Sequence, residues 1–375
     1  MTRHYLDHNA TAPVRPEVAD AVAEAMRADG NSSSVHAEGR AARARVEGAR
    51  DALRRLVNAP VNGVIFTGGG TEAIHYALHG AARAGLATKI FVSAVEHAAV
   101  PANAATTGLP VETIPARADG LVDLDALKTA LAGESGPFLV CLMWANNETG
   151  ALQPVREAAD IVHDAGGLLF VDAAQAAGKV PVNFVMAGAD MMAVTGHKFG
   201  GPLGVGALIV GPNLPLEPVM RGGGHEMNRR AGTHNVPALV GFGVACDLAA
   251  DSLARAGAVA ALRDRMQAAA EDAGARIWAR DVPRLPGTLC LSAEGFAGET
   301  QLMTLDLAGL AVSSGSACSS GKAKPSHVLK AMGASDAECA SAIRVSLGWN
   351  STEADADAFC RVWPDAYDRV TSRVA

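Results

Sequence analysis

Lys198 is the residue whose type and setting most directly suggest chemistry. It follows an apolar run at 191–194 and a Thr-Gly-His tripeptide at 195–197, and a glycine- and proline-containing segment comes after it at 199–202. The apolar run predicts a buried strand and the later segment a turn. A buried lysine can be held partly neutral and form a Schiff base with an aldehyde cofactor, because a buried ammonium group is costly. Taken alone, an ordinary surface lysine explains the pattern better, so its neighbours must decide.

A carboxylate that fits such a lysine lies 26 residues upstream. Asp172 follows the apolar run at 168–171, and Gln175 comes three residues later. Pyridoxal phosphate needs both a Schiff-base lysine and an aspartate, because the carboxylate keeps the pyridine nitrogen protonated and lets the ring accept electrons. His97, beyond the run at 89–93, could lie on that ring and move protons, although a hydrogen-bonded structural histidine is an equal alternative.

A glycine-rich segment supplies a candidate phosphate site. Thr-Gly-Gly-Gly-Thr-Glu-Ala at 67–73 follows a brief apolar run and leads into a predicted helix. Exposed N–H groups at a helix N-terminus bind anions, but this segment lacks both the P-loop ending and the dinucleotide spacing. The segment therefore argues against nucleotide binding, and taken alone it is explained as well by a glycine turn that caps a helix. Beside Lys198 and Asp172, the residues Gly70, Thr71, Thr195 and His197 could hold the phosphate of the cofactor.

These side chains depend on a sheet whose strands end near one another. Apolar runs that predict strands alternate with helical stretches, at 64–66, 89–93, 138–144, 168–171, 191–194 and 205–210. Such alternation predicts an α/β fold with a doubly wound, mostly parallel sheet. The polar candidates follow the carboxyl ends of the strands, where open α/β sheets bind ligands.

The last third of the chain has a different pattern. A basic, glycine-rich segment at 221–233 has no clear secondary structure, and a long helix is predicted at 237–254. After it come short strands, at 288–292 and 309–313, mixed with helices, which predict a smaller α+β domain. We expect a large cofactor-binding domain at 12–252, and a smaller domain built from 1–11 and 253–375.

Composition excludes several classes of function. The net charge of −7 argues against a role at nucleic acid or a membrane surface. No apolar run approaches the ~18 residues that a membrane span needs, and no signal-peptide core is present. The six cysteines have no metal-ligand spacing, so we expect a cytoplasmic chain without a metal site, and five of the six as small buried residues.

Eight short motifs, taken together, resemble a cysteine desulfurase of the class-V aminotransferase group, which has the fold-type-I architecture of pyridoxal-phosphate enzymes. They lie at 5–11, 70–72, 96–97, 146–150, 171–175, 196–198, 230–233 and 313–318. The last, Ser-Ser-Gly-Ser-Ala-Cys, is the most specific. It is similar to the long catalytic loop of the subgroup that supplies sulfur for iron–sulfur cluster assembly or nitrogenase maturation.

The resemblance assigns a role to each matching position. Lys198 would hold pyridoxal phosphate, Asp172 would pair with the ring nitrogen, and Gln175 would bind the ring hydroxyl. His97 would stack on the ring as acid and base. The phosphate would be bound by Gly70, Thr71, Thr195, His197 and Thr233, the last from a partner subunit. The substrate carboxylate would be held by Asn9, Asn147 and Arg344, with Asn147 also beside the cofactor.

The same resemblance implies the reaction and the partners. Cys318 would take the sulfur of L-cysteine as a persulfide, release L-alanine, and pass the sulfur to an iron–sulfur scaffold or another acceptor protein. The enzyme would be a homodimer with shared active sites. Three glycines at 68–70, Thr195 and His234 depart from common family residues, and His234 leaves an effect at the substrate site open.

Other activities remain open on the sequence. An aminotransferase or a β-lyase needs the lysine and the aspartate but not Cys318, whereas a selenocysteine lyase would keep the cysteine. A non-enzymatic assembly scaffold would not need Lys198.

Overall fold

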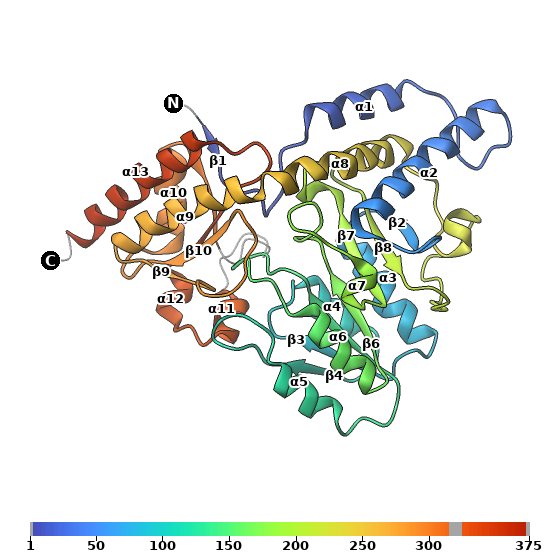
Figure 1. The fold of residues 1–375 in the computed structure, drawn as a ribbon, viewed down its shortest axis with the longest axis horizontal. Helices are drawn as coiled ribbons and strands as arrows, with labels where there is room; N and C mark the ends of the chain where they lie inside the picture. Colours follow the sequence, from blue (N-terminus) through green and yellow to red (C-terminus); the bar gives the residue numbers. More distant parts are fainter. Residues whose placement is uncertain (1–2, 315–324, 373–375) are drawn as a thin grey trace.

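The computed structural model describes residues 3–314 and 325–372. Within them, a seven-stranded sheet has the order β2-β8-β7-β6-β5-β3-β4 (Figure 1). Its strands are β2 (Val64–Thr67), β3 (Lys89–Ser93), β4 (Val111–Ile114), β5 (Phe138–Met143), β6 (Leu168–Asp172), β7 (Met191–Thr195) and β8 (Gly206–Val210). Neighbouring strands are parallel except that β8 runs antiparallel to both β7 and β2. The expected mostly parallel sheet is confirmed, with β8 as its exception.

Helices cover both faces of this sheet, because its central strands are apolar on both sides. On one face, the sheet forms a hydrophobic core with the helices α1 (Pro16–Met26), α2 (Ala37–Val57), α5 (Leu124–Leu131), α6 (Val155–Asp164), α7 (Phe184–Ala187) and α8 (Val236–Ala254). The other packs with α3 (Gly70–Arg83) and α4 (Ala99–Thr106). In β6, Leu169 and Val171 face the first core and Phe170 the second, which is the doubly wound arrangement.

A second, smaller layer lies beside the large sheet (Figure 1). It has the strand order β12-β13-β10-β9, and all of its neighbouring strands are antiparallel. The strands are β9 (Arg276–Ile277), β10 (Thr288–Ser292), β12 (Ser313–Ser314) and β13 (Ala342–Ser346). They pack with the helices α9 (Ala256–Asp272), α10 (Gly298–Leu307) and α13 (Glu353–Thr371) around a separate apolar core.

The N-terminus belongs to this smaller layer. Strand β1 (His4–Tyr5) pairs in parallel with β11 (Leu310–Ala311), and Asp7 bridges to Ser346 of β13. Two short helices, α11 (His327–Ala331) and α12 (Asp336–Ala340), contribute to an apolar cluster that also contains Val95 and Met143 from the ends of the large sheet. The division of the chain at residues 12 and 252 stays a prediction, and α8 continues to Ala254.

Three local predictions were wrong in detail. The strand expected at 309–313 is two short strands, β11 and β12, because the chain crosses from one sheet to the other at Val312. Strand β5 ends at Met143, one residue earlier than expected. The segment 221–233 contains a 3-10 turn, η2 (His225–Asn228), in which Glu226 and Met227 have left-handed backbone conformations.

Helix α8 corrects the expectation that no apolar run is long enough to span a membrane. Among the described residues, α8 is the one helix that is long and apolar enough to cross a membrane, judged by length and composition alone. Half of this apolar stretch is buried inside the protein, where α8 packs against α1 and α2. The ring of Phe242 is fully buried against Phe66 of β2 and Phe199. A core helix passes the same test, so the feature is weak evidence for a membrane.

Candidate active site

A cavity of about 400 Å³ lies at the carboxyl ends of the large sheet's strands. Among the described residues, the sequence-predicted site residues other than Thr233 line it: Asn9, Gly70, Thr71, His97, Asn147, Asp172, Gln175, Thr195, His197, Lys198 and Arg344. They come from the ends of β3, β5, β6 and β7, the start of α3, strand β13 and the N-terminal segment. The alternating pattern therefore predicts the place of the site, because parallel strands end at one edge.

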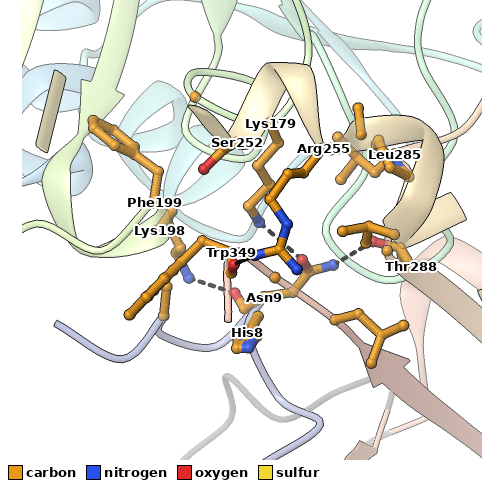
Figure 2. Close-up of a pocket in the computed structure, with 18 residues that line it drawn as sticks. His8, Asn9, Lys179, Lys198, Phe199, Ser252, Arg255, Leu285, Thr288 and Trp349 are labelled. Atoms are coloured by element: carbon orange, nitrogen blue, oxygen red, sulfur yellow. Dashed lines mark hydrogen bonds between the residues drawn. The ribbon is translucent and has the colours of Figure 1, made fainter. Parts of the chain in front are cut away.

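Lys198 enters the cavity from a single 3-10 turn, η1 (Gly196–Lys198), that directly follows β7. Its Nζ donates to the backbone carbonyl of Asn9 at 2.7 Å, drawn in Figure 2, and to that of Ala10 at 2.8 Å. The turn is tight, since a Cβ on Gly201 would lie 2.8 Å from the carbonyl oxygen of Gly196. The side chain is half-buried and held by the N-terminal segment, so it is not an ordinary surface lysine.

Two other lysines must be considered as alternative sites of cofactor attachment. Lys89 lies at the opposite end of β3 from His97, where it pairs with Glu112 at 2.8 Å and Glu134 at 2.7 Å. Lys179 donates to side-chain oxygens of Gln175 and Asn9, and it lines a neighbouring hollow. Of the three, Lys198 is the one that lines the catalytic cavity.

Asp172 is the last residue of β6, and only 5 % of it is exposed. Its Oδ1 accepts the N–H of Ala174 at 2.9 Å. Burial raises the pKa of Asp172, although this hydrogen bond and the nearby His97 and Lys198 oppose the rise. A cationic partner would stabilise the ionised form of this buried carboxylate, and the protonated nitrogen of a pyridine ring is such a partner.

The start of α3 forms the anion-binding end of the cavity. Gly70 and Thr71 begin this 14-residue helix, and Thr195 and His197 line the cavity beside them. Burial, reinforced by Lys198 and Lys179, lowers the pKa of His197 to about 4, so its ring is neutral at pH 7. Hydroxyl groups, helix N–H groups and a neutral imidazole together suit a phosphate.

The glycine run before α3 is tied down by its neighbours. The N–H of Gly68 donates to the carboxylate of Glu72 at 2.6 Å, and Glu72 pairs with Arg230 at 2.8 Å. The loop of three consecutive glycines is therefore held in place by the side chain of Glu72.

Arg344 of β13 also lines the cavity and is 2 % exposed. Its Nη1 donates to the carbonyl of Asn147 at 3.0 Å, and its Nη2 pairs with Asp7 at 2.8 Å. In the described structure its buried Nε has no hydrogen-bond partner. A guanidinium N–H that the protein leaves unsatisfied fits a substrate carboxylate, which arginine binds through planar, paired hydrogen bonds.

His97 presents its ring to the same cavity. Its Nδ1 accepts the N–H of Ala99 at 3.2 Å, so the neutral ring carries its proton on Nε2. Glu96 beside it is buried and accepts the N–H of Met143 at 2.6 Å. Burial and the nearby Asp172 raise the pKa of Glu96 well above its usual value. Glu96 belongs to the sequence motif at 96–97, but the family resemblance assigns it no role.

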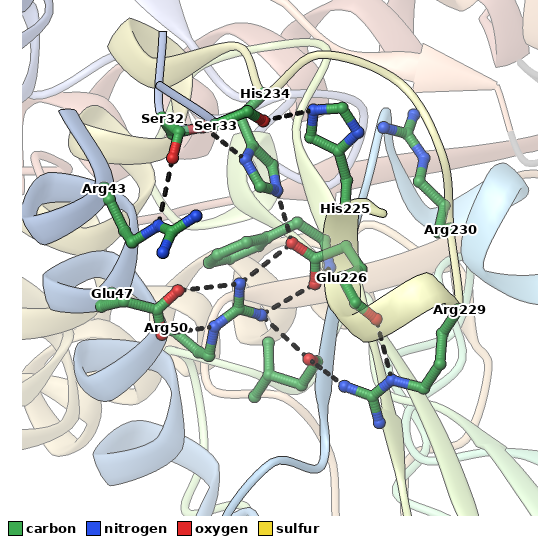
Figure 3. Close-up of polar contacts among 12 residues, drawn as sticks. Ser32, Ser33, Arg43, Glu47, Arg50, His225, Glu226, Arg229, Arg230 and His234 are labelled. Atoms are coloured by element: carbon green, nitrogen blue, oxygen red, sulfur yellow. Dashed lines mark hydrogen bonds and ion pairs between the residues drawn. The ribbon is translucent and has the colours of Figure 1, made fainter. Parts of the chain in front are cut away.

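Thr233 is exposed and does not line this chain's own cavity. The segment that carries it is fixed by Glu226, a 4 % exposed residue whose carboxylate accepts from Arg50, His234 and the N–H of Phe66 (Figure 3). Burial opposes ionisation of Glu226, but His234 and Arg50 lower its pKa to about 2. His234 thus belongs to this anchor, and it is not among the residues that line the catalytic cavity.

Cys318 lies outside the described residues. Of the other cysteines, Cys141, Cys246, Cys290 and Cys339 are buried as expected, while Cys360 is only partly buried. Desolvation raises the pKa of all five thiols, which disfavours the nucleophilic thiolate. Among residues 3–314 and 325–372, no group of three or more histidine, cysteine or acidic residues could hold a metal ion.

Comparisons with known proteins agree with this geometry. The family model for aminotransferase class-V matches residues 4–359. A cysteine desulfurase of Cereibacter sphaeroides is 41% identical over 99% of this chain and 97% of its own length. An IscS-like cysteine desulfurase of Mycobacterium tuberculosis is 40% identical over 97% of this chain and 96% of its own length. The solved structure of a NifS-like protein from Rickettsia africae superimposes with a TM-score of 0.90 at 31% identity, covering 98% of this chain and 99% of that one. The chain therefore belongs to the class-V aminotransferase family and, within it, to the cysteine desulfurases.

Proposed function

We propose that this protein is a pyridoxal-phosphate-dependent cysteine desulfurase, which converts L-cysteine to L-alanine and holds the sulfur as a persulfide on Cys318. The observation that carries the proposal is one cavity that joins Lys198 and the buried Asp172 with Arg344, whose Nε no described residue satisfies. These groups match an aldehyde, a pyridine nitrogen and an amino-acid carboxylate respectively.

The residues of the cavity fit the cofactor from end to end. Lys198 would hold pyridoxal phosphate covalently, Asp172 would pair with its ring nitrogen, and Gln175 would donate to its ring oxygen. The phosphate would lie at the start of α3, against Gly70, Thr71, Thr195 and His197. When bound, the cofactor supplies a ring that accepts electrons from the substrate carbon.

The remaining residues bind the substrate and move its protons. Asn9, Asn147 and Arg344 would hold the carboxylate of cysteine, and His97 would exchange protons beside the ring. The Cys318 thiolate would attack the substrate sulfur, so that an S–S bond forms as the substrate C–S bond breaks. The electron pair of that bond goes to the carbon, which takes up a proton and becomes the methyl group of alanine. The role of Cys318 is supported by the motif at 313–318.

The partners follow from the family. We propose a cytoplasmic homodimer in which Thr233 of each subunit reaches the phosphate of the other subunit's cofactor. The sulfur acceptor is an iron–sulfur scaffold or another protein, in keeping with relatives named IscS-like and NifS-like.

Purified protein supplied with pyridoxal phosphate and L-cysteine tests the activity. We expect equal amounts of alanine and of sulfur, recovered as sulfide in the presence of a reducing thiol. A parallel assay with selenocysteine separates the two lyase activities. Turnover of selenocysteine without turnover of cysteine would replace this proposal with a selenocysteine lyase, and pyruvate as the product would replace it with a β-lyase.

A further inference from the structure

Lys179 is a partly buried amine that the chemistry above does not use. It lies four residues after Gln175, in the turn that follows β6. Its Nζ donates to Gln175 Oε1 at 2.7 Å and to Asn9 Oδ1 at 2.9 Å, the second of which is drawn in Figure 2. Both acceptors belong to residues that line the catalytic cavity, whereas Lys179 itself lines the hollow behind it.

These two bonds fix the orientation of both side-chain amides. A lysine amine donates hydrogen bonds, so the atoms that face it must be the amide oxygens. The amide nitrogen of Gln175 then points the other way, where it donates to the carbonyl of Asn9 at 2.8 Å. The amide nitrogen of Asn9 donates to Thr288 Oγ1 at 2.9 Å and to the carbonyl of Asn147 at 3.2 Å.

The arrangement holds whatever the charge of the lysine, because both amide nitrogens face backbone carbonyls, which can only accept a hydrogen bond. Burial, reinforced by Lys198 and Arg344, lowers the pKa of Lys179 well below its usual value, while Asp7 opposes the change. A neutral amine still has two hydrogens, one for each of its two amide oxygens. An apolar side chain at this position would leave both oxygens without that donor, which costs free energy at a buried site.

We infer that Lys179 is a positioning residue, which turns the amide of Gln175 so that its N–H group, and not its oxygen, faces the ring oxygen of bound pyridoxal phosphate. The inference rests on the cofactor site of the proposed function. An amide held in this direction donates to a negatively charged ring oxygen, whereas the reversed amide would place two oxygens against each other. Lys179 acts through Gln175 and does not itself touch the cofactor.

The test compares how well the holoenzyme and its variants retain the cofactor. Retention is measured from the visible absorbance of the bound cofactor as the protein is diluted. Lys179→Met keeps the length of the side chain and removes the donors, and we expect it to lose cofactor roughly tenfold more readily. Lys179→Arg restores the hydrogen-bond donors. The hollow that Lys179 lines can accommodate the larger guanidinium group, so this variant should retain the cofactor. It also guards against a general loss of folding.

A double-mutant cycle with Gln175→Ala decides how Lys179 acts. If Lys179 works by orienting Gln175, adding Lys179→Met to Gln175→Ala causes little further loss of cofactor. Full additivity of the two effects, or equal retention by Lys179→Met and the parent, would overturn the inference. Retention is measured without cysteine, so a parent that binds cofactor but makes no alanine would contradict the proposed activity alone.

Discussion

Arg344 shows what a single buried side chain contributes to this site. Two of its nitrogens bond to Asn147 and Asp7, but its Nε finds no partner among the described residues. A buried donor without a partner raises the free energy of the protein, and an incoming carboxylate removes that cost. Under the proposed function, Arg344 would therefore supply part of the affinity for an amino acid before the substrate arrives.

Replacing Lys198 with alanine tests the cofactor attachment. The variant should purify without covalently bound cofactor, because the amine that Asn9 and Ala10 hold in the cavity is gone. Borohydride reduction of the parent, followed by mass spectrometry of peptides, should place the label on Lys198. Lys89→Met serves as the control and should keep that label, because Lys89 pairs with Glu112 and Glu134 away from the cavity. A label on Lys179 or Lys89 in the parent would contradict the assignment.

Replacing Cys318 with alanine should separate substrate binding from sulfur transfer. The variant should still bind cysteine and change the colour of the cofactor, since Lys198 and Arg344 are intact. It should release essentially no sulfide, and mass spectrometry should find no persulfide. Cys360→Ala is the matched control, because this partly exposed thiol has a raised pKa and should not matter. Parent-like alanine formation by Cys318→Ala would argue against the persulfide route.

Most catalytic candidates could be predicted because each follows an apolar run in the sequence. Asp172 and Lys198 occupy such positions, and the structure brings them to one cavity. Lys179 could not be recognised in this way, because its proposed role depends on the two amide oxygens to which it donates. One of them belongs to Asn9, 170 positions away in the chain, and no local pattern records such a contact.

At the scale of elements, the segment 221–233 shows how a loop is held without regular secondary structure. Three consecutive residues, Glu226, Met227 and Asn228, have left-handed backbone conformations, which are costly for residues other than glycine. The Glu226 carboxylate offsets that cost through its bonds to Arg50, His234 and the β2 backbone (Figure 3). The sequence identifies the loop from its glycines, but not the anchor, because α2 and β2 supply the partners.

Glu226→Gln should lower the free energy of unfolding by about 3 kcal/mol at pH 7, which is the equivalent of moving a pKa from 4.5 to about 2. A carboxyl with a lowered pKa stabilises the fold above its unfolded value of 4.5. That contribution is lost as the pH falls through the folded value of about 2. The difference between variant and parent should therefore shrink with acidification, as measured by denaturant unfolding.

Glu47→Gln is the matched control for this anchor. Glu47 also pairs with Arg50, at 3.0 Å, but its side chain is 55% exposed. An exposed pair contributes only about 0–1 kcal/mol. Equal destabilisation by the two substitutions would show that the Glu226 contact is not the anchor.

At the scale of the whole molecule, the active site forms where two sheets meet. The large sheet supplies Asp172 and Lys198, the small one supplies Arg344, and the N-terminal segment supplies Asn9. The sequence predicts a second, smaller domain from the change in pattern after Pro283, but not the crossing at Val312 or the pairing of β1 with β11. Those depend on contacts between distant segments, which single-sequence patterns do not contain.

Mixed dimers test whether the site also crosses between subunits. Lys198→Ala and Thr233→Asp should each be inactive, the second because a carboxylate repels the phosphate. If each site combines Lys198 of one chain with Thr233 of the other, a mixed dimer has one site with both defects and one with neither. Co-expression should then recover activity. No recovery, with mixed dimers shown by mass spectrometry, would rule out sharing.

The path of the N-terminal segment also determines when the protein becomes competent during its own synthesis. The carbonyls that hold Lys198 belong to Asn9 and Ala10, which are made well before Lys198 itself. Their segment is fixed by β11 at Leu310–Ala311 and by Ser346 of β13, which are made well after it. A chain still on the ribosome already contains Lys198 and Asp172, but it lacks the residues that seat the N-terminus against them. Capture of the cofactor in its final geometry thus waits until β13 has been made, and chains that stop before it lack the completed reactive site.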